Sequence, residues 1–121
     1  MAQRTSETIA AAATPVGRSA IGLIRLSGPG SFDILANVFH PHGKRAFPAP
    51  FAVFPGLIKH PHGGAAIDQV VVTTYVAPHS YTGEDLAEIG THGNPVVISS
   101  VLATLFAAGA APAEAGEFLE V

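Results

Sequence analysis

The stretch Ala77–Gly93 places turn-forming residues, three carboxylates and two histidines among apolar runs. The run before it, Ile67–Val76, and the run Leu86–Thr91 within it are rich in β-branched and apolar residues, which predicts two strands. A helix is expected immediately afterwards. Because loops held on a rigid scaffold commonly carry function, the polar groups of this stretch predict a functional site.

Two more strands are expected before this stretch. Ala20–Ser27 is apolar and β-branched, which is typical of a buried strand. Phe51–Ile58 also predicts a strand, and its Pro55-Gly56 pair predicts that this strand lies at a sheet edge or carries a bulge. Between them, the proline-rich segment His40–Pro50 is expected to be a connection.

Helical spacing of apolar residues predicts two helices. The first covers Phe32–Phe39 and takes Ser31 as its cap. The second takes Asn94 as its cap and Pro95 as its first residue, and it stops at Gly109. The sequence therefore predicts an α+β (mixed α/β) fold: a small mixed β-sheet packed with two or three helices. A length of 121 residues fits one domain, 1–121.

The composition constrains the partners. Only 12% of the residues are charged, about half the usual share, and 48% are hydrophobic. A partner that covers part of the surface explains this, and a plain alanine- and glycine-rich domain is the alternative. The net charge of −3 without a basic run predicts no direct nucleic-acid binding. No apolar run is long enough for a membrane and no signal peptide is recognisable, so the cytoplasm is expected.

A short echo in the sequence contains four histidines. It reads His40-Pro41-His42-Gly43 and then His60-Pro61-His62-Gly63. Four histidines could indicate a metal, but no cysteine or carboxylate is close in sequence, and proline with glycine favours solvated turns. We therefore expect turns and no metal site.

Two charged residues lie inside predicted strands. Arg25 is the only charge within Ser19–Gly30, and Glu88 lies within an apolar run. Charged groups are seldom buried unless they are paired, so each needs a partner. They could satisfy each other as an ion pair, or both could line a pocket in which the carboxylate accepts two parallel N–H bonds, such as a pterin presents.

Weaker candidates surround this pair. Thr82 begins a segment that could be a plain turn, and Arg18 could reach a carboxylate or a phosphate or could simply be solvated. His92 and Gly93 come just before the second helix, where free N–H groups could receive an anion, although capping by Asn94 is the ordinary explanation. The sequence has no phosphate-binding loop and no nucleophile elbow, and it offers no catalytic residue.

These residues together resemble the N-terminal domain of the MnmE (TrmE) family of tRNA modification GTPases. The matching pieces follow one another in order along nearly the whole chain: Thr8–Ala10, Ala13–Pro15, Gly17-Arg18, Ala20–Gly28, Ala77–Asp85, Glu88, His92-Gly93 and Gly116–Phe118. The resemblance implies a fold similar to the folate-binding domain of aminomethyltransferases. It also adds Tyr81, within the matching loop, to the cofactor-binding candidates.

The resemblance implies a homodimer that binds 5-formyl-tetrahydrofolate or a related tetrahydrofolate near the subunit interface, with Arg25 and Glu88 at folate-contacting positions. In the family, a helical domain and a GTPase domain follow, and they are absent from this chain. GTP, magnesium and potassium bind in that GTPase domain. With a flavin-dependent partner, the family takes part in a 5-aminomethyl-type modification of the wobble uridine in tRNA.

The chain departs from the family pattern at Thr91 and Asn94, where glycines are usual, and at Ala115, where proline is usual. It ends shortly after Phe118, before a segment in which the family carries a further folate-contacting lysine, so a fragment without that group is expected. Three functions remain open: a folate-binding dimerisation module, a ligand-free dimerisation module, and a stand-alone one-carbon transferase. The presence of both Arg25 and Glu88 favours the first.

Overall fold

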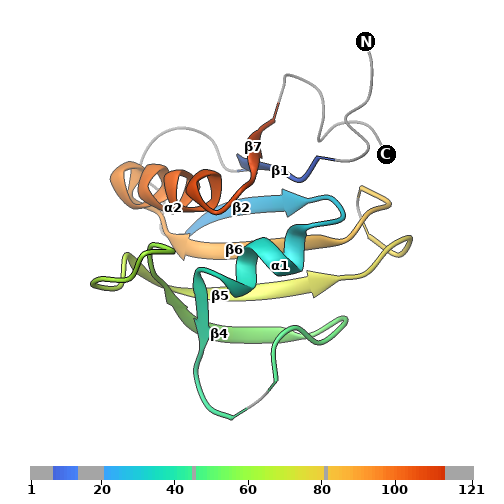
Figure 1. The fold of residues 1–121 in the computed structure, drawn as a ribbon, viewed down its shortest axis with the longest axis horizontal. Coiled ribbons are helices and arrows are strands. Elements are labelled where there is room, and N and C mark those ends of the chain that lie inside the picture. The colour runs from blue at the N-terminus through green and yellow to red at the C-terminus, as the bar shows by residue number, and fades with distance from the viewer. Residues whose placement is uncertain (1–6, 14–20, 45, 81, 114–121) are drawn as a thin grey trace.

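The computed structural model describes residues 7–13, 21–44, 46–80 and 82–113 (Figure 1). These residues form seven strands and two helices, in the order β1 (Ile9–Ala12), β2 (Ile21–Ser27), α1 (Ser31–Ala36), β3 (Phe39–Pro41), β4 (Val53–Ile58), β5 (Asp68–Tyr75), β6 (Leu86–His92), α2 (Pro95–Ala107) and β7 (Ala111–Pro112). The strands make one sheet with the order β3-β4-β5-β6-β2-β1-β7. β1 and β7 are parallel, while the other neighbours are antiparallel. The mixed sheet and two helices confirm the predicted α+β class.

Both helices lie on one face of the sheet. Leu35 of α1 and Leu105 of α2 belong to the same buried cluster as Ile24, Val72 and Ile89 from the central strands. Figure 1 shows the two helices in front of the strands. Because side chains alternate between the two faces of a strand, the residues between these buried ones point to the other face.

No helix of the described part of the chain covers that other face, which we call the helix-free face. Its members alternate with the buried core residues: Ile21, Leu23 and Arg25 of β2, Glu88 and Gly90 of β6, Val71, Thr73 and Tyr75 of β5, and Val53 of β4. The antiparallel register sets them in rows across the sheet, for example Arg25 opposite Glu88 and Glu88 opposite Thr73.

The second helix follows its sequence signals. The Asn94 side chain accepts a hydrogen bond from the Val96 N–H at 2.8 Å, and Pro95 is the first helical residue. Gly109 follows the helix with a φ of +119°, a conformation that glycine adopts at little cost. The cap and the stop that the sequence predicts are therefore confirmed. Neither α1 nor α2 is long and apolar enough to cross a membrane, and this holds only for the described residues.

The first helix is shorter than predicted. It ends at Ala36, and Phe39 instead begins β3, where it is buried against the core. Ser31 is not the cap but the first helical residue, and its hydroxyl donates to the Gly28 carbonyl at 2.8 Å. The apolar side chain of Phe39 is compatible with the spacing of a helix and also with a strand. The pairing of β3 with β4 therefore decides its conformation.

The expectations for Pro55 and for the connection His40–Pro50 were also partly wrong, because His40 and Pro41 of that connection belong to β3. β4 is not an edge strand, because β3 pairs with its second half, and its register with β5 runs without a bulge. The Pro55 carbonyl accepts the His42 N–H at 2.9 Å just beyond the end of β3. Proline lacks an N–H but keeps its carbonyl. Pro55 can therefore lie next to β3, because this short strand needs no hydrogen bond from the Pro55 nitrogen.

Candidate functional site

Arg25 and Glu88 are direct cross-strand partners on the helix-free face. The Arg25 Nε donates to Glu88 Oε2 at 2.9 Å, and the two side chains are 26% and 22% exposed. β2 and β6 are adjacent and antiparallel, so two strand residues that are 63 positions apart in sequence meet at this point. The ion pair, one of the two readings of these residues, is formed in the structure.

Tyr75 adds a third polar group that sequence reasoning missed. Its hydroxyl donates to Glu88 Oε1 at 3.3 Å from the end of β5. Partial burial raises the pKa of the Tyr75 hydroxyl above its ordinary value, the neighbouring Glu88 raises it further, and the charge of Arg25 opposes the shift. We call Arg25, Glu88 and Tyr75 the polar trio.

The loop between β5 and β6 shelters one end of the helix-free face. Alternation places Ser27 and Leu86 on that face, yet both are fully buried. Ser27 Oγ lies 2.7 Å from Thr82 Oγ1 and donates to Glu84 Oε1 at 3.2 Å. The loop therefore covers the row next to Arg25 and Glu88, which leaves the polar trio beside a wall rather than on a flat surface.

Thr82 belongs to this wall. It contacts Ser27, which lies two positions after Arg25 on β2. The segment around it also makes the local bonds of a turn: Gly83 donates to the Ser80 carbonyl, and Asp85 Oδ1 accepts the Ala77 N–H at 3.0 Å. The turn reading of this segment is therefore confirmed.

The opposite side of the trio is apolar and open. Leu23, Gly90 and Val71 form the next row across β2, β6 and β5. Among the described residues, a methyl group built on Gly90 would have just the Val71 carbonyl oxygen within 4 Å, at 3.6 Å. Within this part of the chain, the missing side chain therefore leaves space between Glu88 and His92, which lies two positions beyond Gly90 on β6.

His92 has a partner that the sequence did not suggest. Its Nδ1 lies 2.6 Å from Asp68 Oδ1, and its backbone N–H donates to Asp68 Oδ2 at 2.9 Å. The His92 side chain is 71% exposed and that of Asp68 only 8%. Gly93 follows His92 in the turn into α2, where Asn94 already caps the helix, so the capping reading of this helix start is confirmed.

The other sequence candidates lie either outside the described residues or away from this site. Arg18 and Tyr81 lie outside the described residues. In the histidine echo, the Gly63 N–H donates to the His60 carbonyl, which confirms a turn in the second copy, whereas His40 and Pro41 belong to β3 rather than to a turn. Within the described ranges, no group of three or more histidines and carboxylates is placed to hold a metal ion.

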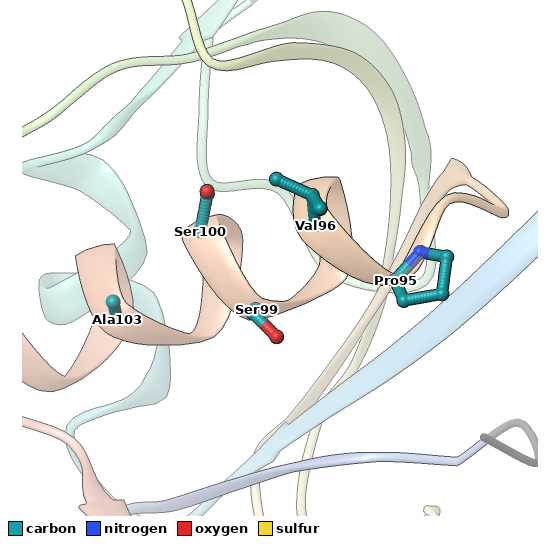
Figure 2. A pocket seen from close by; sticks show the side chains of 5 residues that line it. All are labelled: Pro95, Val96, Ser99, Ser100 and Ala103. Atoms are coloured by element: carbon teal, nitrogen blue, oxygen red, sulfur yellow. The ribbon is translucent and has the colours of Figure 1, made fainter. Parts of the chain in front are cut away.

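A shallow groove lies elsewhere, along α2. Pro95, Val96, Ser99, Ser100 and Ala103 line it, and Figure 2 shows their side chains on successive turns of this one helix. None of these side chains is charged, so the groove offers a ligand only hydroxyl and backbone groups. The polar trio is the stronger candidate for a ligand site.

Comparison with known proteins places the chain in a family. Residues 8–120 match the family described as the GTP-binding protein TrmE N-terminus. The chain is 46% identical over 113 residues to the tRNA modification GTPase MnmE of Thermus thermophilus, 44% over 115 residues to that of Endomicrobium trichonymphae, and 47% over 117 residues to that of Akkermansia muciniphila. These alignments cover 92–93% of this chain but only 23–26% of the relatives. The matched region includes the polar trio and its wall, and the chain belongs to the TrmE N-terminal domain family.

Proposed function

We propose that this chain is the folate-binding and homodimerisation domain of a tRNA modification GTPase, and that the helix-free face holds a 5-formyl-tetrahydrofolate-like ligand at the polar trio. Family membership supports the tRNA modification setting, since the relatives are named tRNA modification GTPases. The observation that carries the ligand half is the carboxylate of Glu88, held in place from two sides within a sheltered corner of an otherwise apolar face.

The donor set of the trio suits the edge of a pterin. Among the described residues, each Glu88 oxygen has one partner, and an ionised carboxylate offers about four lone-pair sites, so it can accept further N–H groups. Arg25 donates to one oxygen of this carboxylate, and Tyr75 donates to the other. A bound tetrahydrofolate would supply a one-carbon unit, while the residues of this chain bind and orient it.

The rest of the proposed activity belongs to a longer protein. The chain spans about a quarter of the length of the curated relatives it matches. GTP, magnesium, potassium, the flavin-dependent partner and the tRNA with its wobble uridine are all proposed as ligands or partners of that longer protein, in the cytoplasm. This domain contributes the folate site and the dimer contact.

Exposed apolar side chains support the dimer half of the proposal. Ile21, Val53 and Val71 are 66%, 51% and 46% exposed on the helix-free face. Burying apolar surface is the main favourable term in protein association, and two-fold dimers are the commonest closed assembly. A second copy of the chain that covers this face would bring the ligand site close to the subunit contact.

Calorimetric titration with 5-formyl-tetrahydrofolate tests the ligand half. Glu88→Gln replaces one acceptor oxygen by a donor, and hydrogen bonds to charged groups contribute about 1.5–3 kcal/mol, so binding should weaken by about tenfold or more. Asp33→Asn makes the same chemical change on the exposed side of α1 and should bind like the parent. If Glu88→Gln keeps the parent's affinity and melting temperature, the trio is not the folate site.

One observation favours a second candidate, a dimerisation module without a ligand. Arg25 and Glu88 form an ion pair within the chain itself, so neither requires a ligand to be satisfied. In that case the parent chain would dimerise but would show no heat of folate binding. The same titration, run beside a measurement of mass in solution, separates the two functions.

A further inference from the structure

His92 is largely exposed, yet one nearly buried carboxylate, that of Asp68, bonds both its ring and its backbone N–H. Asp68 uses one oxygen for the His92 ring and the other for the His92 backbone N–H. Asp68 lies at the start of β5 and His92 at the end of β6, so both ends of the contact rest on the sheet. A surface histidine with no such partner would sample several ring orientations.

This contact fixes the tautomer as well as the orientation of the ring. An ionised carboxylate only accepts hydrogen bonds, so the proton of the neutral ring must be on Nδ1. Nε2 then carries the lone pair, and it has no partner within the described part of the chain. The arrangement matches the way in which a second residue sets the tautomer of a functional histidine elsewhere.

The position of His92 relates this lone pair to the polar trio. Glu88, Gly90 and His92 occupy alternate positions of β6, and a strand rises about 3.3 Å per residue, so the two outer residues are roughly 13 Å apart along the strand. Gly90 lies between them without a side chain, flanked by Leu23 and Val71. Along β6, the sheet thus runs from the polar trio past an apolar middle to His92, whose ring contacts Asp68 at the end of the sheet.

We propose that Asp68 is a positioning residue, which holds His92 so that Nε2 accepts a hydrogen bond from the far end of the ligand that Glu88 orients. The ligand part rests on the proposed function. A folate carries an aromatic ring and then an amide N–H beyond its pterin. The ring fits the apolar strip at Gly90, and the amide N–H is the donor that an Nδ1-protonated histidine can receive.

The tautomer is tested by long-range proton–nitrogen NMR spectra of the full chain, recorded above the ordinary histidine pKa of about 6.5. His92 is expected to carry its proton on Nδ1. His60 is a control with the opposite tautomer. Its Nδ1 accepts the His62 N–H at 3.2 Å, so the proton of its neutral ring must be on Nε2. If His92 shows the His60 pattern in the parent chain, the inference is overturned.

Asp68→Asn sharpens this test because the shape of the side chain is retained. The amide oxygen can keep the His92 backbone N–H, and the amide NH₂ then donates to Nδ1, so the proton of the ring moves to Nε2. A change of the His92 tautomer with an unchanged His60 spectrum supports the positioning role. An unchanged His92 tautomer in a folded Asp68→Asn variant contradicts it.

The ligand contact is tested by titration of 5-formyl-tetrahydrofolate into Asp68→Asn, His92→Ala and the double variant. Each single variant should bind about threefold to tenfold more weakly, because one neutral hydrogen bond is lost. The double variant should lose no more than either single one, since both remove the same contact. A pterin without the benzoylglutamate should bind the parent and the variants equally.

The outcomes separate this inference from the proposed function. If Glu88→Gln weakens folate binding while Asp68→Asn binds like the parent, this inference fails and the proposed function stands. If the parent chain binds no folate, the proposed function and the ligand contact both fail, and the NMR spectra still decide whether Asp68 sets the tautomer.

Discussion

At the scale of single residues, the polar trio shows what the sequence could and could not predict. Arg25 and Glu88 stood out as lone charges in apolar strands, and their pairing was one of two readings. Tyr75 and Asp68 gave no such signal, because a tyrosine or an aspartate at a strand end is ordinary. Their partners are 13 and 24 positions away in sequence, and only the strand register brings them together.

The raised pKa of Tyr75 has a consequence for stability at high pH. A phenol whose folded-state pKa lies above its unfolded value contributes stability that is present below the unfolded pKa, about 10, and is lost as the pH rises through the folded pKa. The free energy of unfolding, measured as a function of pH, should therefore fall less above about pH 10 in Tyr75→Phe than in the parent.

Ultraviolet titration checks the pKa of Tyr75 directly. The chain has two tyrosines, so Tyr81→Phe leaves Tyr75 as the only phenol. Its hydroxyl should ionise at a higher pH than tyrosine in a short peptide. Ionisation at or below the peptide value would mean that the hydroxyl is neither partly buried nor beside Glu88 in solution.

At the scale of elements, local signals predicted best where they were redundant. α2 has a cap, a proline at its start and a glycine after its end, and all three agree with the structure. α1 and β3 had only apolar spacing, which cannot distinguish a helix from a short strand at Phe39. Sheet pairing decided between them, and no local signal reports that pairing.

Gly28 provides a test of how tightly β1, β2 and α1 meet. Its φ is +137°, and an added methyl group would lie 2.6 Å from the Glu7 carbonyl oxygen and 2.7 Å from Thr8 Cα. Gly28→Ala should therefore cost about 2–5 kcal/mol of unfolding free energy, from backbone strain and overpacking together.

Gly83 is the matched control for this substitution. It also has a positive φ, +78°, but an added methyl group would meet none of the described residues within 4 Å. Gly83→Ala should cost only the strain, about 1–2 kcal/mol, in the same denaturant titration. Equal losses in the two variants would show that the β1–β2–α1 junction has room for a side chain.

At the scale of the whole molecule, a sheet with helices on one face leaves the other face to be explained. The sequence indicated a covered surface through its low charge, but it did not locate that surface. The structure gives two regions with exposed apolar side chains, the helix-free face and the groove along α2. The dimer proposal assigns the first of them to a second copy of the chain.

Substitution of one exposed valine in each region distinguishes them. Val71→Asp should shift the dimer to monomer in light scattering at tens of micromolar, because it places a charge in the proposed contact. Val96 is 73% exposed at the start of α2, where an acidic side chain is favourable for the helix, so Val96→Asp should leave the dimer intact. A monomer for Val96→Asp and a dimer for Val71→Asp would move the interface to α2.

The most direct test of the central claim is a map of amide chemical-shift changes on the chain during titration with 5-formyl-tetrahydrofolate. We predict saturable changes centred on Arg25, Glu88 and Tyr75, with further changes along β6 toward His92, and little change along the groove of α2. Saturable changes confined to the α2 groove around Ser100, or an unchanged spectrum at saturating ligand, would contradict the assignment of the folate site to the helix-free face.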